Sequence, residues 1–242
     1  MQNKWYWIFR NIIFGPFLRV YNRPEIVGVD NIPSTGPAII ASNHQSVMDS
    51  FFLPLLCPRQ ITFLAKAEYF NGTTLVGRLQ KWFFTNVGQR PVNRTSASAG
   101  QDALNTAVEV LNDGDLFGIY PEGTRSPDGR LYKGKTGVAR IALASGAQVI
   151  PVAMIGTRDV NPIGTWFPRP GKVRVKVGDP IYPIEFVNNR GLERDSYEAI
   201  RALTDHIMRQ LQQLSGQEYA DVYAAEVKKA LAEGGDSSPH NP

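Results

Sequence analysis

The segment 37–49, PAIIASNHQSVMD, contains the change of pattern that decides the fold. Its first five residues form a short apolar run between a proline and an asparagine, which is typical of a buried strand. A polar stretch with His44 and Asp49 follows and leads into the apolar run 51–57. We expect this run to be a buried helix in spite of Pro54. The segment therefore predicts a strand, a polar loop and a helix in succession.

The same succession continues along the chain. Short apolar or alternating runs predict further strands, the last of them near a sheet edge, at 24–30, 61–65, 116–120, 149–155 and 172–177. Helical spacing and end signals predict helices at 75–84, 99–113, 137–145 and 196–214. Strands separated by helices are typical of an α/β fold. We therefore predict a mostly parallel central sheet flanked by helices.

Composition is consistent with one such domain. The chain has 242 residues, of which 43% are apolar, and we expect the domain at 24–215, followed by a polar tail, 216–242, with a disordered end. The single cysteine, Cys57, excludes an internal disulfide and is expected to be buried. No ligand spacing suggests zinc, and we expect no metal. The net charge of +4 favours anionic partners, but no Lys/Arg-rich block suggests nucleic acid.

The first 22 residues combine many aromatic and aliphatic side chains with scattered cations. The longest charge-free stretch, 11–18, is far shorter than the ~20 residues that span a bilayer. No small-residue cleavage site follows, so we do not expect a secretory signal. Aromatic rings flanked by Lys and Arg suit the headgroup region of a lipid surface. We predict that residues 1–23 form an aromatic membrane-interface helix; the alternative is a helix that covers the core of its own domain.

His44 and Asp49 form the first pair of side chains suited to catalysis. His44 lies where a strand ends, and Asp49 is little more than one helical turn further on, so its carboxylate can reach the imidazole. A carboxylate that accepts from one ring nitrogen leaves the other nitrogen free to take a proton, which activates an alcohol. Taken alone, the pair has an alternative interpretation as a capping histidine beside a solvated aspartate.

The stretch 120–126, YPEGTRS, comes directly after a predicted strand and is expected at the same sheet edge as the first pair. Gly123 permits close backbone approach, and Arg125 offers a planar fork that suits phosphate. Thr124 adds a hydroxyl donor. We expect Glu122 to bond a substrate hydroxyl or to orient Arg125. The alternative is a surface turn with an ion pair.

Two further cationic loops flank this stretch. The segment 90–94, RPVNR, ends in Arg94, and Lys133 and Lys135 follow on the other side. Several cations around one pocket would neutralise a phosphomonoester and orient it through charge-assisted hydrogen bonds. Each cation alone is equally well explained as a solvated surface charge.

In this order, these pieces resemble the glycerolipid acyltransferase family, and in particular its lysophosphatidate acyltransferases. The resemblance covers about residues 24–180. It is carried by the HX4D pair His44 and Asp49, the loop residue Arg94, the run 121–126 and the apolar segment 149–153 with its central proline. The first and third of these blocks are highly specific, because chance rarely yields both in order.

The resemblance implies an O-acyltransferase of phospholipid synthesis. Such an enzyme moves a fatty acyl group from acyl-CoA or acyl carrier protein to the hydroxyl of lysophosphatidate, giving phosphatidate. His44, oriented by Asp49, would take the proton of the attacking hydroxyl, without cofactor, metal or acyl-enzyme. The glycerol-phosphate end would be held by Arg94, Glu122, Gly123, Thr124, Arg125 and, as an assisting residue, Lys133.

Several alternatives stay open from the sequence. Glycerol 3-phosphate or a larger lysophospholipid would use the same cations as lysophosphatidate. Because thioester donors are cytosolic and the chain has neither an export signal nor paired cysteines, we expect peripheral or monotopic attachment at the cytoplasmic face of the cell membrane. A non-catalytic lipid-binding protein would share the aromatic N-terminus but has no use for the pair His44 and Asp49.

A nucleotide-hydrolysing protein is the remaining alternative. The segment 129–136, GRLYKGKT, matches the phosphate-cradling pattern G-x-x-x-x-G-K-[ST], and a predicted helix follows it. That pattern requires a strand that leads straight into its first glycine. The nearest predicted strand ends at Tyr120, so we do not expect a phosphate-cradling loop here.

Overall fold

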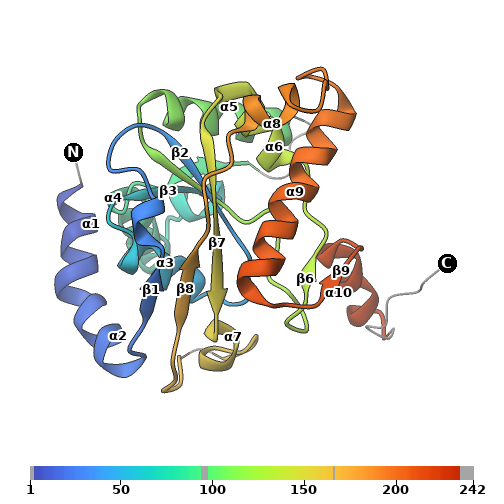
Figure 1. The fold of residues 1–242 in the computed structure, drawn as a ribbon. Coiled ribbons are helices and arrows are strands. Elements are labelled where there is room, and N and C mark those ends of the chain that lie inside the picture. Colours follow the sequence, from blue (N-terminus) through green and yellow to red (C-terminus); the bar gives the residue numbers. More distant parts are fainter. Residues whose placement is uncertain (1–2, 94–97, 166, 235–242) are drawn as a thin grey trace.

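The computed structural model describes residues 3–93, 98–165 and 167–234 (Figure 1). Its centre is a seven-stranded sheet in the order β1-β8-β7-β2-β5-β3-β4. Neighbouring strands in it are parallel, except for β7 and β8. The bounds are Glu25–Val27 (β1), Ala38–Ser42 (β2), Ile61–Lys66 (β3), Arg90–Val92 (β4), Leu116–Ile119 (β5), Gln148–Ile155 (β7) and Arg174–Val177 (β8). The predicted α/β fold is confirmed, with β4 as an edge strand that the sequence did not indicate.

Helices cover both faces of this sheet. One core lies against α5 (Ala99–Asn112), α6 (Gly137–Ser145), α8 (Pro183–Asn188) and α9 (Tyr197–Ser215). The other lies against α2 (Gly15–Tyr21) and α3 (Asp49–Leu56), which contains Pro54 as expected. In β2, Ile39 belongs to the first core and Ile40 to the second, so the whole strand is buried. Burial on both faces explains why β2 reads as a continuous apolar run.

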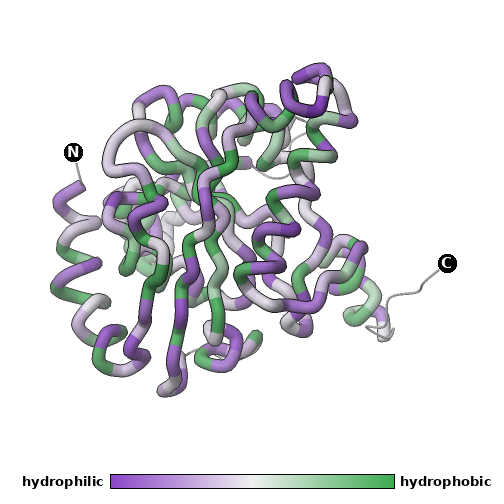
Figure 2. The backbone as a smooth tube through the Cα atoms, viewed as in Figure 1, coloured by the Kyte–Doolittle hydropathy of each residue, from purple (hydrophilic) through white to green (hydrophobic). Residues whose placement is uncertain are grey.

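Local signals set the ends of the longer helices. The Ser196 hydroxyl accepts from the backbone N–H of Ala199 at the start of α9. Gly146 ends α6 with a φ of 71°, a left-handed conformation that glycine adopts without strain. Purple and green alternate along α9 in Figure 2, and its buried residues recur at helical spacing: Ala199, Ile200, Leu203, Thr204, Ile207, Met208 and Leu211. Shorter or peripheral helices are α4 (Leu75–Asn86), α7 (Thr157–Val160) and the 3-10 turns η2 (Val29–Asn31) and η3 (Ala67–Phe70).

The N-terminal segment is helical but interrupted. It consists of α1 (Lys4–Ile8), the π-helical turn η1 (Phe9–Ile13) and α2. One side packs on the domain: Tyr6 is buried, its hydroxyl donates to the Pro54 carbonyl, and the Arg10 guanidinium donates to the Leu55 carbonyl. The other side exposes Trp5, Trp7, Ile12, Ile13, Phe17 and Val20. Thus the segment covers its own domain and also presents apolar surface outward.

The described part of the chain contains no helix that is both long and apolar enough to traverse a bilayer. The predicted position of the N-terminal segment at a membrane interface stays a prediction.

The segment after residue 216 differs from the predicted polar tail. It forms β9 (Tyr219–Ala220), which pairs with β6 (Leu131–Tyr132), and α10 (Ala224–Ala232). Ala224 is buried against Tyr132 and Ala220. The polar composition concealed this element because a few small side chains against one tyrosine suffice to dock it. The end that was expected to be disordered, 235–242, lies outside the described residues.

Two substitutions in the first turn of α10 test whether this helix is docked. Ala224→Asp introduces an unpaired charge beside Tyr132, and we expect α10 to detach, with about tenfold or faster hydrogen exchange across 224–232. Ala225→Asp is the matched control, because Ala225 is exposed and an acidic residue is favourable in the first turn of a helix. Equal exchange in the two variants would show that α10 is not packed on the domain.

Candidate active site

The two polar loops predicted to meet do so at one edge of the sheet. β2 and β5 are parallel neighbours, so the loops after Ser42 and Ile119 leave from the same side. The backbone N–H of His44 donates to Oε1 of Glu122 (2.8 Å). In return, the backbone N–H of Ser126 donates to the His44 carbonyl oxygen (2.8 Å). Both backbone groups of His44 are therefore held by the loop 120–126.

The imidazole of His44 is oriented by Asp49 as the sequence predicts. Nδ1 of His44 lies 2.9 Å from Oδ2 of Asp49, which is fully buried at the start of α3. The same oxygen accepts from the backbone N–H groups of Gln45 (2.7 Å) and Ser46 (2.8 Å). A carboxylate can only accept here, so Nδ1 carries the proton and Nε2 keeps a free lone pair. This is the arrangement of a general base with a fixed tautomer.

Asn43 fixes the loop on its other side. Its side-chain oxygen accepts from the backbone N–H of Met154 in β7 (2.6 Å), and its amide donates to the Met154 carbonyl (3.0 Å). The amide also donates to Gln217, which in turn donates to the Gly129 carbonyl. The side chain before the catalytic candidate is thus a buried bridge from β2 to β7 and to the segment before β9.

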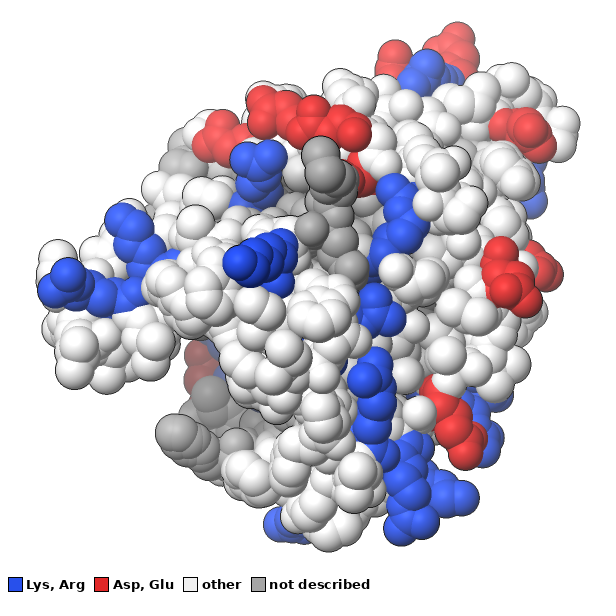
Figure 3. Space-filling model, turned by 90° about the vertical axis from the view of Figure 1, so that its left-hand side faces the viewer, with Lys and Arg blue, Asp and Glu red and all other residues white. Residues whose placement is uncertain are grey.

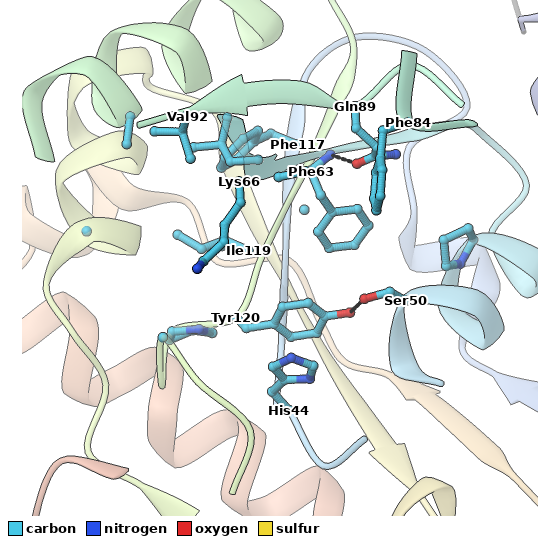
Figure 4. Close-up of a pocket in the computed structure, with 18 of the residues that line it drawn as sticks. His44, Ser50, Phe63, Lys66, Phe84, Gln89, Val92, Phe117, Ile119 and Tyr120 are labelled. Atoms are coloured by element: carbon cyan, nitrogen blue, oxygen red, sulfur yellow. Dashed lines mark hydrogen bonds between the residues drawn. The ribbon is translucent and has the colours of Figure 1, made fainter. Parts of the chain in front are cut away.

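Tyr120 supports the imidazole from its face, a role that the sequence analysis did not assign. The rings of His44 and Tyr120 are stacked with centroids 3.9 Å apart, and Phe63 stacks on the far side of Tyr120 (Figure 4). The Tyr120 hydroxyl is hydrogen-bonded to the Ser50 hydroxyl (3.1 Å). Burial and the nearby Asp49 raise the pKa of Tyr120, so the phenol stays neutral. The only signal in the sequence is the aromatic residue at the junction of strand and loop.

Glu122 has a different position from the predicted one. It is fully buried and does not line the cavity beside His44; its Oε1 accepts from His44, and its Oε2 accepts from the backbone N–H of Tyr132 (3.1 Å). Burial raises the pKa of Glu122 to about 8, although both N–H groups and Lys228 oppose the shift. The predicted role of Glu122 in binding a substrate hydroxyl or orienting Arg125 is therefore corrected: its oxygens hold the backbone.

A large cavity adjoins the imidazole. Its volume is about 1160 Å³, and His44 and Arg125 both line it, as the sequence predicts. One part has apolar walls from the N-terminal helices, α3, β3 and α4: Phe9, Phe14, Leu18, Phe51, Phe63, Phe83 and Phe84. Another part is lined by Gly123, Thr124 and cations from three elements. The space thus has a polar end and an apolar extension.

The cations at the polar end differ in part from the predicted set. Arg125 and Lys135 line it, together with Lys66 from β3 and Arg140 from α6; Figure 4 shows Lys66 reaching into the same space. Lys133, predicted to assist at the phosphate, instead lies 3.0 Å from Asp221 next to β9 and does not line the cavity.

The signature loop and the second cationic loop complete the predicted set. Gly123 has a φ of 73°, so glycine is favoured at this turn, and a Cβ there would crowd the Lys135 side chain at 3.1 Å. Arg94 was predicted to bind phosphate; it lies outside the described residues.

The segment 129–136 does not have the geometry of a phosphate-cradling loop. β5 ends at Ile119, well before Gly129, and the short strand β6 lies inside the motif and pairs with β9. The backbone N–H of Lys135, which a cradle would direct at phosphate, donates to the Pro121 carbonyl (2.8 Å). The match to the nucleotide-binding pattern is therefore coincidental.

Comparison with known proteins gives consistent matches. The family described as Acyltransferase matches residues 23–155, more than half of the chain. The chloroplastic 1-acyl-sn-glycerol-3-phosphate acyltransferase LPAT1 of Arabidopsis thaliana is 32% identical over 72% of this chain and 47% of its own length. A Bacillus subtilis protein named 1-acyl-sn-glycerol-3-phosphate acyltransferase is 27% identical over 81% of this chain and 87% of its own.

A solved structure shares the fold. The crystal structure of the 1-acyl-sn-glycerophosphate acyltransferase PlsC of Thermotoga maritima aligns with a TM-score of 0.61 and 26% identity, covering 86% of this chain and 82% of that one. This chain spans about half the length of the Arabidopsis protein and of its Brassica napus counterpart.

The buried carboxyl of Glu122 gives a pH dependence that can be measured. Its pKa is raised from 4.5 in the unfolded chain to about 8, so its contribution to stability is complete below about pH 4.5 and is lost as the pH rises through 8. In Glu122→Gln one backbone N–H loses its acceptor, but this titration is absent. We expect the stability advantage of the wild type over Glu122→Gln to shrink by roughly 2–5 kcal/mol between about pH 5 and pH 9.

Urea unfolding of both proteins across this pH range measures the difference. His206, whose pKa is lowered by burial, Arg209 and Arg190, titrates in both proteins and cancels. A difference that is constant with pH would mean that Glu122 is ionised throughout.

Proposed function

Because the chain belongs to the acyltransferase family, we propose that it transfers a fatty acyl group from a thioester to the free hydroxyl of lysophosphatidate, giving phosphatidate. The observation that carries the proposal is that the Asp49-oriented imidazole of His44 and the guanidinium of Arg125 line one cavity. The names of the Arabidopsis and Bacillus relatives support lysophosphatidate as the acceptor.

The proposed reaction proceeds within one complex of protein, donor and acceptor. Nε2 of His44 takes the proton from the acceptor hydroxyl as its oxygen attacks the thioester carbonyl carbon. Asp49 stabilises the resulting imidazolium through Nδ1. The tetrahedral intermediate then expels the thiolate, which receives the proton from His44, so that ester and thiol are the products. Stacking on Tyr120 keeps the ring at one angle during both transfers.

The two parts of the cavity suit the two parts of a lysophospholipid. Arg125 and Lys135, with the hydroxyl of Thr124, would neutralise and orient the phosphate at the polar end. The apolar extension beside Phe63, Phe83 and Phe84 would take an acyl chain out of water. A volume of about 1160 Å³ exceeds that of most small-molecule sites, which are about 300–1,000 Å³, as a lipid requires.

Replacement of His44 tests the reaction. We expect His44→Ala to lower kcat by about 100- to 10,000-fold, because general-base help is lost while the cavity and the cations remain. His206→Ala is the matched control, since His206 lies on α9, packs on Phe186 and does not line the cavity. Thiol release from acyl-CoA, and separately from acyl carrier protein, is measured on addition of lysophosphatidate, glycerol 3-phosphate or lysophosphatidylcholine.

The unfolding temperature of His44→Ala is compared with that of the wild type. Equal values mean that a loss of turnover comes from the missing base and not from misfolding. Full activity of that variant would refute the assignment of the base. Lysophosphatidate binding without thiol release by the wild type would favour a non-catalytic lipid-binding protein instead. Faster turnover of glycerol 3-phosphate or lysophosphatidylcholine would show that lysophosphatidate is not the preferred acceptor, while the reaction would still be acyl transfer.

The same proposal includes attachment to a lipid surface at the cytoplasmic side, where thioester donors are made. Its support is the outward apolar face of α1, η1 and α2, which is continued by Leu75, Val76, Leu79 and Trp82 of α4. Trp5 and Trp82 are in edge contact, so the two elements adjoin. Figure 3 looks onto this side of the molecule and shows a column of Lys and Arg beside a broad uncharged area. This combination suits an anionic bilayer.

Charged substitutions on this face test the attachment. Ile12 is 58% exposed and Val20 80% exposed, so Ile12→Glu with Val20→Glu changes surface rather than core. We expect at least about tenfold weaker binding to phosphatidylglycerol vesicles, because each substitution loses apolar burial and adds repulsion. Tyr197→Glu is the control, because Tyr197 is 70% exposed at the start of α9 on the other side of the molecule (Figure 1). Unchanged binding by the double variant would place the lipid surface elsewhere.

A further inference from the structure

The C-terminal helix α10 delivers a cation to the signature loop. Nζ of Lys228 lies 2.7 Å from Oγ1 of Thr124. Desolvation and the neighbouring Arg125 lower the pKa of Lys228, while the neighbouring Glu122 opposes the shift. α10 lies beyond residues 23–155, which the family match covers.

The direction of this hydrogen bond determines whether the Thr124 hydroxyl accepts or donates. An ammonium group has three donors and no acceptor, so Oγ1 must accept from Lys228. The hydroxyl proton of Thr124 then points away from the ammonium group, and Thr124 lines the polar end of the cavity next to Arg125. A threonine held in this way keeps its own proton for donation to another group, such as an anion in the cavity.

The charge of Lys228 is also available to the site. The nearby carboxylate of Glu122 has its two oxygens on the backbone N–H groups of His44 and Tyr132. Within residues 3–93, 98–165 and 167–234, no carboxylate forms an ion pair with Lys228. Lys228 therefore adds a positive charge to those of Arg125 and Lys135 in the surroundings of one phosphate. A phosphomonoester carries about −1.5 to −2 charges at neutral pH, so a further nearby cation stabilises it.

The helix that bears Lys228 is tied to both site loops. Ala224 is buried with Tyr132. The backbone N–H of Lys133 donates to the carbonyls of Ala220 and Val222. Gln217, which precedes β9, bridges Asn43 and Gly129. These contacts fix the approach of Lys228 to Thr124.

We propose that Lys228 is a positioning residue of the acceptor site, which holds the Thr124 hydroxyl as a donor to the phosphate of the acceptor and adds charge behind it. This proposal rests on the proposed function, since it names a further part of the same site. It assigns the C-terminal segment a role in recognising phosphomonoesters as acceptors.

Steady-state kinetics test this assignment. We expect Lys228→Met to raise the KM for lysophosphatidate about tenfold while kcat stays within about twofold, because the chemical groups are untouched. Lys228→Arg should recover most of the loss, because it keeps a charged donor. Lys229→Met is the matched control: the next residue on α10 is exposed and lies 4.0 Å from Glu233. If Lys228 had only a structural role, both the Met and the Arg variant would show a lower kcat and a lower unfolding temperature.

A double-mutant cycle tests the route through Thr124. Thr124→Val should raise KM by a similar factor, and Lys228→Met added to Thr124→Val should have little further effect beyond the loss of charge. Fully independent effects, or an unchanged KM in Lys228→Met, would overturn the assignment.

A binding measurement separates this proposal from the proposed reaction. Calorimetry with glycerol 3-phosphate, the soluble headgroup of the acceptor, should show about tenfold weaker binding by Lys228→Met than by Lys229→Met. If the wild type releases no thiol with lysophosphatidate but still binds glycerol 3-phosphate through Lys228, the reaction fails and the anion site stands. If turnover is present and Lys228→Met matches the wild type in both measurements, only the role of Lys228 fails.

Discussion

The buried carboxyl group of Glu122 is the constraint on which the site depends. Its two oxygens join the loop after β2 to the strand β6 through the backbone N–H groups of His44 and Tyr132. The Ser126 N–H closes the connection on the His44 carbonyl. The parallel register of β2 and β5 brings the loops near each other, but a register alone does not set the angle of a ring. The bond that Glu122 accepts and the bond that Ser126 donates fix the backbone from which the imidazole projects, and Asp49 and Tyr120 then hold the ring itself.

Two buried carboxylates in one site have different tasks because they meet different donors. Asp49 accepts from a ring nitrogen as well as from two backbone N–H groups, so its charge acts on the base. Glu122 accepts from the backbone only, so its two oxygens hold the scaffold. Both are fully buried, so residue type and burial alone do not distinguish their tasks. The difference follows from the position of each at a helix start or at a strand end.

Features that depend on local sequence signals could be predicted, whereas those that depend on contacts between distant residues could not. β2, β5 and α6 were predictable because apolar runs and glycine ends are local signals, and so was the meeting of His44 with Asp49 on one loop. The different roles of Lys133 and Lys135 were not predictable. Lys133 pairs with the distant residue Asp221, so only Lys135 lines the cavity. β9 and α10 were not predictable for the same reason, because they pack on Tyr132, which lies far earlier in the chain.

The N-terminal helices link the cavity to the outside in a way that follows from helical geometry. Phe9, Phe14 and Leu18 line the apolar extension, while Ile12, Ile13 and Val20 face outward. One short segment therefore separates the interior of the cavity from the exposed apolar face. On the proposed function, an acyl chain that leaves a bilayer for this cavity exchanges one apolar environment for another, so the transfer needs little exposure to water. The cations then hold the phosphate, the charged part of the acceptor, which keeps the acceptor hydroxyl beside His44 where the polar and apolar parts of the cavity meet.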